Sequence, residues 1–348
     1  MYKMKIENMN ALFRTISGTQ DLITPIRSAG QTNFGLWTEE ASVDLHTLKT
    51  AKSGKDAFFP QSENLYTCLR KGQRLTIEPE ALRERPFTVF GMRACDVRGV
   101  EVLDRVFLAE PVDTFYAARR SHGTIVALAC HEPEESCFCQ VFGTDCAEAC
   151  ADVTVWMVGD MLYWKELTEK GIALTETVGA LLEGADAADE AALNVEKEAI
   201  RRITEQLPYT GLSLEGWGRD ATDVKFHSPV WEMLYHPCLA CGTCTFVCPT
   251  CQCYDIKDYD TGHGVQRYRC WDSCMYSDFT MMAHGNNRTS QMQRFRQRFM
   301  HKLVYFPENN EGMYSCVGCG RCVEKCPEGL NIVKVIKAFA PEGGERNG

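Results

Sequence analysis

The sequence lacks long apolar segments. Nowhere does it hold the run of about eighteen apolar residues that a membrane-spanning helix requires. Its beginning, MYKMKIENMN, has basic residues but no uninterrupted apolar core behind them, unlike a secretory signal peptide. Nineteen cysteines would indicate a disulfide scaffold only in a much shorter, secreted chain, whereas this chain has 348 residues. We therefore expect a protein of the reducing cytoplasm, without membrane insertion, from an anaerobic organism.

Common fingerprints of catalysis are also missing. There is no Gly-x-Gly-x-x-Gly, no phosphate-binding P-loop and no His-Glu-x-x-His pair, so the common nucleotide sites and zinc hydrolysis find no support. The 47 acidic and 37 basic residues give a net charge of −10, which argues against a nucleic-acid partner. A protein with no evident flavin, nicotinamide or substrate site is better suited to carrying electrons than to starting or finishing a reaction.

The chain does have two copies of one cysteine spacing, Cys-x2-Cys-x2-Cys-x3-Cys-Pro. The first motif comprises Cys238, Cys241, Cys244 and Cys248, and the second motif comprises Cys316, Cys319, Cys322 and Cys326. In bacterial two-cluster ferredoxins three cysteines of such a run bind one [4Fe-4S] cluster, and the cysteine before proline binds the other. We therefore predict two [4Fe-4S] clusters with exchanged fourth ligands. Cluster 1 takes Cys238, Cys241, Cys244 and Cys326, and cluster 2 takes Cys316, Cys319, Cys322 and Cys248.

Zinc and disulfides explain this spacing less well. Zinc sites use two separate Cys-x2-Cys pairs, not a run of three cysteines plus Cys-Pro that occurs twice. Disulfides would have to join sulfurs across loops that are too short for their geometry. Gly242, Gly318 and Gly320 favour iron, because a backbone that closes around a cluster needs positive φ angles and no side chain in the way.

Further cysteines suggest a third [4Fe-4S] cluster. Cys95 and Cys130 follow segments that read as buried strands, and an acidic loop beyond them supplies Cys137 and Cys139. Ligands bind at the carboxyl ends of strands in open α/β sheets, so these four thiols could converge there. Against this, unligated cysteines often serve as small buried packing groups. Cys251, Cys253 and Cys274 form a rival set, and Cys68, Cys146, Cys150 and Cys270 are interpreted as structural.

The periodicity of the sequence indicates two domains. Residues 87–90 and 124–129 read as strands, residues 98–108 as a helix, and residues 153–158 with 161–164 as a hairpin. A helical, Ala- and Glu-rich segment at 183–206 and glycine-rich residues 211–219 precede the first motif. We predict an α+β or α/β protein. A mixed α/β domain spans residues 1–215, and a helical, ferredoxin-like two-cluster domain spans 216–348, with a long insertion between its motifs.

The insertion contains a basic stretch. Residues 279–307 have no Asp or Glu, but they have five cations, Arg288, Arg294, Arg296, Arg298 and Lys302. Such a stretch could neutralise cluster charge or bind an acidic partner, or it could be a solvated helix face. Its isolation within an acidic protein favours a functional interpretation.

Several motifs are similar to those of one protein family. They are Arg93-x-Cys95-Asp96, Cys130-x-Glu132-Pro133-x3-Cys137-Phe138-Cys139, Cys248-Pro249-Thr250-Cys251-x-Cys253, Trp271-x-Ser273-Cys274, His301-Lys302 and the second motif. From about residue 87 onward the chain resembles the beta subunits of cytoplasmic sulfhydrogenases and the corresponding electron-transfer subunits of anaerobic sulfite reductases. The family pattern does not fix the roles of Cys146, Cys150 and Cys270.

The resemblance implies an electron-relay subunit of a hetero-oligomer, placed between a flavin subunit that binds NAD(P) and a redox subunit that performs catalysis. A hydrogenase, a sulfite reductase and a heterodisulfide-reductase-like enzyme all fit as the catalytic partner. Two other functions stay open. The cysteines at the strand ends could hold a site that reduces a sulfur compound directly, or the clusters could only stabilise a redox-sensing or scaffolding protein.

Overall fold

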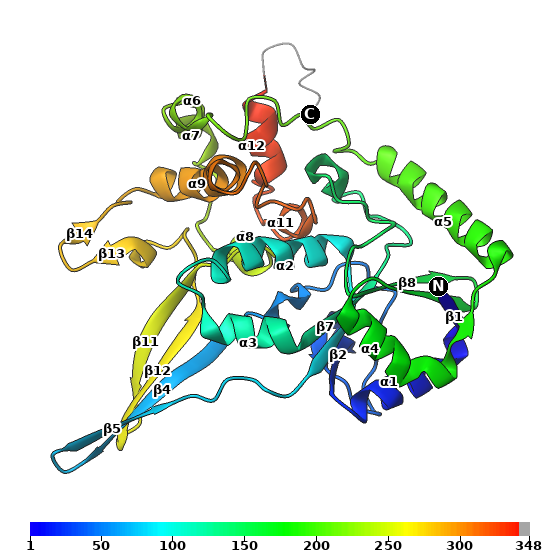
Figure 1. Cartoon of the computed structure of the whole chain (residues 1–348). Coiled ribbons are helices and arrows are strands. Elements are labelled where there is room, and N and C mark those ends of the chain that lie inside the picture. Colours follow the sequence, from blue (N-terminus) through cyan, green and yellow to red (C-terminus); the bar gives the residue numbers. More distant parts are fainter. Residues whose placement is uncertain (341–348) are drawn as a thin grey trace.

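A computed structural model describes residues 1–340, and its larger sheet has eight strands in the order β10-β1-β9-β8-β7-β6-β2-β3 (Figure 1). These strands are β1 (Tyr2–Lys5), β2 (Asp21–Ser28), β3 (Gln31–Leu36), β6 (Phe87–Met92), β7 (Gly123–Leu128), β8 (Val153–Val158), β9 (Met161–Glu166) and β10 (Glu183–Gly184). The four central strands β2, β6, β7 and β8 run parallel, and the outer strands pair antiparallel. The predicted strands and hairpin are confirmed.

Helices cover both faces of this sheet, which is why β6 and β7 are predominantly apolar. Every residue of these two strands is buried. Phe87 and Ile125 pack on one face, while Phe90 and Val126 pack on the other. The first face lies under α2 (Ala94–Phe107), α3 (Thr114–His122) and α5 (Ala187–Glu205), and the second under α1 (Met9–Ser17) and α4 (Glu169–Val178).

The sheet order brings two of the predicted ligands to one edge. Because β6 and β7 are parallel neighbours, the residues that follow them emerge side by side. Cys95 lies in the first turn of α2, and Cys130 lies two residues beyond the end of β7.

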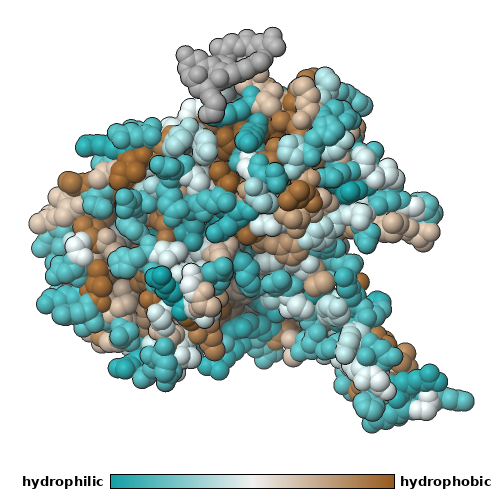
Figure 2. Space-filling view, turned by 180° about the vertical axis from the view of Figure 1, so that it is seen from behind, coloured by the Kyte–Doolittle hydropathy of each residue, from teal (hydrophilic) through white to brown (hydrophobic). Residues whose placement is uncertain are grey.

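A second sheet projects from the body of the protein as an antiparallel arm in the order β11-β12-β4-β5 (Figures 1 and 2). Its strands are β4 (Ser62–Lys71), β5 (Arg74–Pro79), β11 (Tyr254–Asp260) and β12 (Gly264–Trp271). The arm therefore joins strands from both sides of the predicted boundary at residue 215. That boundary stays a prediction, and residues 341–348 of the second predicted domain lie outside the described residues.

The remaining elements are short helices around a third core. They are α6 (Thr222–Phe226), α7 (Val230–Leu234), α8 (Thr243–Phe246), α9 (Gln291–Met300), α10 (Phe306–Asn309), α11 (Arg321–Glu324) and α12 (Ile332–Ala338), with the two-residue strands β13 (Met281–Met282) and β14 (Gly285–Asn286). Trp231, Phe295, Phe299 and Ile336 fill the space between them. The α+β fold class is confirmed. Within residues 1–340, no helix has both the length and the apolar character needed to cross a membrane.

A buried ion network fixes the arm to the α/β sheet. Arg269 of β12 is 3% exposed, and its Nε donates to Glu63 of β4 at 2.6 Å. The same guanidinium contacts Asp113, the N-cap residue of α3, and Arg119 of α3 also contacts Glu63. The arm and α3 are thus tied through charges that water does not screen.

We expect Arg269→Met to lower the free energy of unfolding by about 3 kcal/mol, because the change leaves Glu63 and Asp113 with less compensation in a buried site. Urea unfolding followed by fluorescence gives the value. The matched control is Arg267→Met, two residues away on the same strand, since Arg267 pairs with Asp258 in solvent and should be nearly silent. If both substitutions lowered the free energy of unfolding equally, the buried ion network around Arg269 would not be what stabilises the arm.

Candidate metal centres

The two cysteine motifs fold alike. In each, a glycine with a left-handed backbone, Gly242 (φ 74°) or Gly320 (φ 77°), begins a one-turn helix that carries the third cysteine. A side chain on Gly242 would collide with the Tyr276 hydroxyl, and one on Gly320 would collide with Ser136. These glycines therefore let the loops turn tightly where a larger residue would be both strained and obstructed. The two helices, α8 and α11, contact each other.

The first cavity is lined by three cysteines of the first motif and one of the second. Its sulfur-bearing residues are Cys238, Cys241, Cys244 and Cys326. The remaining wall includes Met275, Phe295 and Arg298. This is the set that the sequence predicts for cluster 1.

The second cavity has the reciprocal composition. Its cysteines are Cys316, Cys319, Cys322 and Cys248. Phe138, Lys302 and Arg298 complete much of the wall. The structure thus brings together both predicted ligand sets, each with a fourth cysteine from the opposite motif.

The chemistry of these thiols suits an iron–sulfur cluster. Burial raises the pKa of Cys244 to about 11 and that of Cys319 to about 12, so each thiol must lose a proton when it binds a metal. Backbone groups also point at the sulfurs. The Ala240 N–H donates to the Cys238 sulfur at 3.4 Å, a contact of the kind that adjusts cluster potentials.

Two residues of the predicted basic stretch are buried against the cavities. Arg298 lies on α9, and Lys302 lies in the π-helical turn His301–Tyr305 that continues it. Lys302 Nζ donates to Thr250 Oγ1 at 2.7 Å and to the Ser315 carbonyl at 3.2 Å. Burial opposes its charge, yet the thiols of Cys248 and Cys251 raise the pKa of Lys302 above its usual value.

Two other cations of the stretch, Arg294 and Arg296, take different roles. Arg294 donates to the carbonyls of Met275 and Arg288, and Arg296 lies 3.6 Å from the ring centre of Phe226. Of the five cations of the stretch, Arg298 and Lys302 are the two that line the first two cavities. The basic stretch is therefore not a solvated helix face throughout, and not all of its cations line the cavities.

A third cavity lies at the carboxyl ends of β6 and β7. It is lined by all four predicted cysteines, Cys95, Cys130, Cys137 and Cys139. Arg93 and Lys49 supply cations beside them. Arg93 is 3% exposed and donates to the Ala129 carbonyl at 2.7 Å and to the Leu45 carbonyl at 2.7 Å, which holds it at the strand ends.

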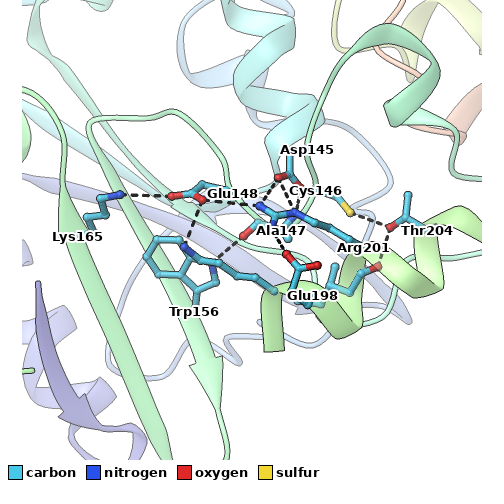
Figure 3. Close-up of polar contacts among 11 residues, drawn as sticks. Asp145, Cys146, Ala147, Glu148, Trp156, Lys165, Glu198, Arg201 and Thr204 are labelled. Carbon is cyan, nitrogen blue, oxygen red and sulfur yellow. Dashed lines mark hydrogen bonds and ion pairs between the residues drawn. The ribbon is translucent and has the colours of Figure 1, made fainter. Parts of the chain in front are cut away.

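Cys146, which the sequence predicts to be structural, lines the third cavity in addition to the four predicted cysteines. Hydrogen bonds from Cys130 and Cys139 lower the pKa of Cys146 to about 3, and its sulfur also lies 3.1 Å from Thr204 Oγ1. Figure 3 shows how α5 holds the loop that carries it. The only signal in the sequence was its place in the same cysteine-rich loop, seven residues after Cys139.

The loop around Cys146 is fixed by polar contacts on both sides (Figure 3). Arg201 of α5 donates to Asp145 at 2.7 Å, and the Trp156 indole of β8 donates to the Ala147 carbonyl at 2.7 Å. Cys146 is consequently held between the sheet and the helix.

The three rival cysteines do not form one group. Cys253 and Cys274 interact with each other, which lowers the pKa of Cys253, whereas Cys251 interacts with Cys248 of the first motif, which raises the pKa of Cys251. The buried Lys55 donates to the Cys251 carbonyl at 2.8 Å. Of the cysteines taken as structural, Cys68 and Cys270 lie in the arm, on β4 and β12, and Cys150 is exposed.

The second and third cavities are in direct contact. Gly318 and Cys319 line both of them. The Phe138 N–H donates to the Gly318 carbonyl at 2.9 Å, so the second motif packs on the loop that bears Cys137 and Cys139. Arg321, two residues after Cys319, forms a buried ion pair with Asp96 of α2 at 2.6 Å.

This fold and its paired cysteine motifs define an iron–sulfur protein with a 4Fe-4S dicluster domain, and the family description of that domain matches residues 237–330. A curated relative, sulfhydrogenase 2 subunit beta of Pyrococcus furiosus, is 35% identical over 261 residues, which cover 72% of this chain and 73% of the relative. The chain therefore belongs to the family of sulfhydrogenase beta subunits, as its motifs predicted. No solved structure matches it.

The exchange of fourth ligands predicts which cluster each Cys→Ser substitution removes. We expect Cys248→Ser to remove the same EPR signal as Cys319→Ser and to spare the signal that Cys241→Ser removes, because Cys248 lies in the cavity of the second motif. Cys270→Ser, on the arm, is the control and should retain every signal. If Cys248→Ser instead abolished the signal assigned to its own motif, the exchange would be wrong.

Proposed function

We propose that this chain is the electron-relay subunit of a cytoplasmic, multi-subunit oxidoreductase, and that it holds three [4Fe-4S] clusters. The observation that carries the proposal is a row of three cysteine-lined cavities whose neighbours share wall residues. Such clusters, when bound, accept and release single electrons. The chain's own part is to hold, space and tune them.

The shared walls give the row its order. Arg298 lines both the first and the second cavity, and Gly318 with Cys319 lines both the second and the third. Neighbouring cavities therefore adjoin each other. This arrangement supports transfer along the row without a mobile carrier.

The two ends of the row reach different surfaces. At the first cavity, Cys241 is exposed, and the adjacent Leu239 has 63% of its surface exposed. At the third cavity, Leu48 and Pro133 also line an open surface groove. The polar residues of that groove are His46, Thr47, His131, Glu132, Glu134, Glu135, Ser136 and Glu324.

Two exposed ends suit two partners. We infer that a flavin subunit that binds NAD(P) contacts one end and a catalytic redox subunit the other, in a hetero-oligomer. The relative's printed name, a beta subunit of a sulfhydrogenase, supports a multi-subunit setting. A hydrogenase, a sulfite reductase or a heterodisulfide-reductase-like enzyme would serve as the catalytic partner.

Direct reduction of a sulfur compound is the second candidate, because the polar groove adjoins the third cavity. The number of cysteines at that cavity argues against it, because Cys95, Cys130, Cys137, Cys139 and Cys146 line it together with Cys319 of the second motif. Four cysteines are enough to ligate all four irons of a cubane, so a cluster held by them has no iron position open to a substrate. Relay is therefore the function that the geometry supports better.

Iron content tests the third site. We expect anaerobically purified protein to hold about twelve irons per chain, by cubane stoichiometry, and Cys137→Ser to hold about eight. The exposed Cys150, which lies beyond the same loop, offers the control Cys150→Ser, which should keep the full content. About eight irons in the unaltered protein would eliminate the third cluster while leaving the first two.

The relay function predicts electron storage without turnover. The isolated chain should take up about three electrons in a reductive titration, one for each cubane, and return them to an oxidising dye. It should not reduce sulfite or a disulfide continuously when a reduced dye is supplied. Sustained consumption of either compound, proportional to protein and lost in Cys137→Ser, would favour the enzymatic alternative.

A further inference from the structure

We propose that Arg298 is a counter-charge shared by the first two cluster sites, and that it raises both of their reduction potentials together. The inference rests on the proposed function, since it requires clusters in both cavities. It goes further by assigning the electrostatic coupling of the two sites to one side chain.

Arg298 occupies the wall between the two cavities. It lines both, and it lies near Cys244 of the first and Cys322 of the second. Its position is fixed by the core, because Phe295 and Phe299 of the same helix are 1% and 0% exposed. The guanidinium carbon lies 4.4 Å from the ring centre of Phe299.

Among the residues that the structure describes, no carboxylate compensates the charge of Arg298. The residue is 4% exposed, and within residues 1–340 its buried Nε has no hydrogen-bond partner. A buried cation needs a partner of opposite charge, and the thiolates and the clusters they hold are the negative groups at hand.

Arg321 shows what a compensated arginine looks like in the same region. It is 1% exposed and also adjoins a cluster site, but it donates to both carboxylate oxygens of Asp96, at 2.6 and 3.0 Å. Its charge is therefore largely neutralised before any cluster binds. Arg298 keeps its full charge for the clusters.

An uncompensated cation in a poorly screened site favours the more negative state of whatever it adjoins. Each added electron makes a cluster more negative, so the guanidinium stabilises the reduced form and raises the potential. Because it adjoins both cavities, both potentials should rise. Lys302 differs, since it lines the second cavity and not the first.

Redox titrations followed by EPR test the proposal on the full chain with its clusters. In Arg298→Met both potentials should move to more negative values, while that of the third site stays in place. In Lys302→Met the second potential should move more than the first. Arg296→Met is the control on the same helix and should titrate like the unaltered protein, because Arg296 faces Phe226.

Each outcome decides the question. Unchanged potentials in an iron-loaded Arg298→Met protein, or a shift of only one of the two, would overturn the shared role. Arg298→Lys, which keeps the charge, should titrate close to the unaltered protein, and a loaded Lys variant with both potentials lowered would also overturn it. An unaltered protein without iron would instead refute the proposed function itself.

Discussion

The structure depends on bringing two cysteine motifs together although residues 249–315 separate them. Each motif alone supplies three cysteines to its cavity, and the fourth must arrive from the other. The contact of α8 with α11 makes this exchange possible, and the left-handed Gly242 and Gly320 give both loops the required turn. The insertion cannot lie between the motifs in space. It therefore extends outward as β11 and β12 and returns as α9, which covers the paired motifs.

The course of the insertion explains how an acidic protein surrounds its cluster sites with positive charge. Four-thiolate cubanes are anionic, and a carboxylate in their walls would make reduction harder in a medium that screens charge poorly. The walls of the first two cavities contain Arg298 and Lys302, and among the described residues Glu328, at the rim of the first, is their one carboxylate. At the third cavity, Glu134 and Glu324 stay in the outer groove, where they pair with Lys49.

Local sequence patterns were enough to predict the strands whose burial depends mainly on their own apolar residues. Continuous apolar runs identified β6 and β7, and their burial on both faces is the reason such runs exist. The pairing of β4 with β12 was not accessible in this way, because a buried contact between Arg269 and Glu63, 206 residues apart, helps to set it. Cys146 was missed for a similar reason, since its place depends on Thr204 in a distant helix.

The close approach of the second and third cavities depends on Gly318, a residue without a side chain. Gly318 has a φ of 61°, and a Cβ there would collide with the Phe138 carbonyl. Any larger residue would push the second motif away from the loop that bears Cys137 and Cys139. The second and third cavities can adjoin each other this closely because this position has no side chain. Gly318 therefore allows the loop of the second motif to close, and it also allows the third cavity to lie next to that loop.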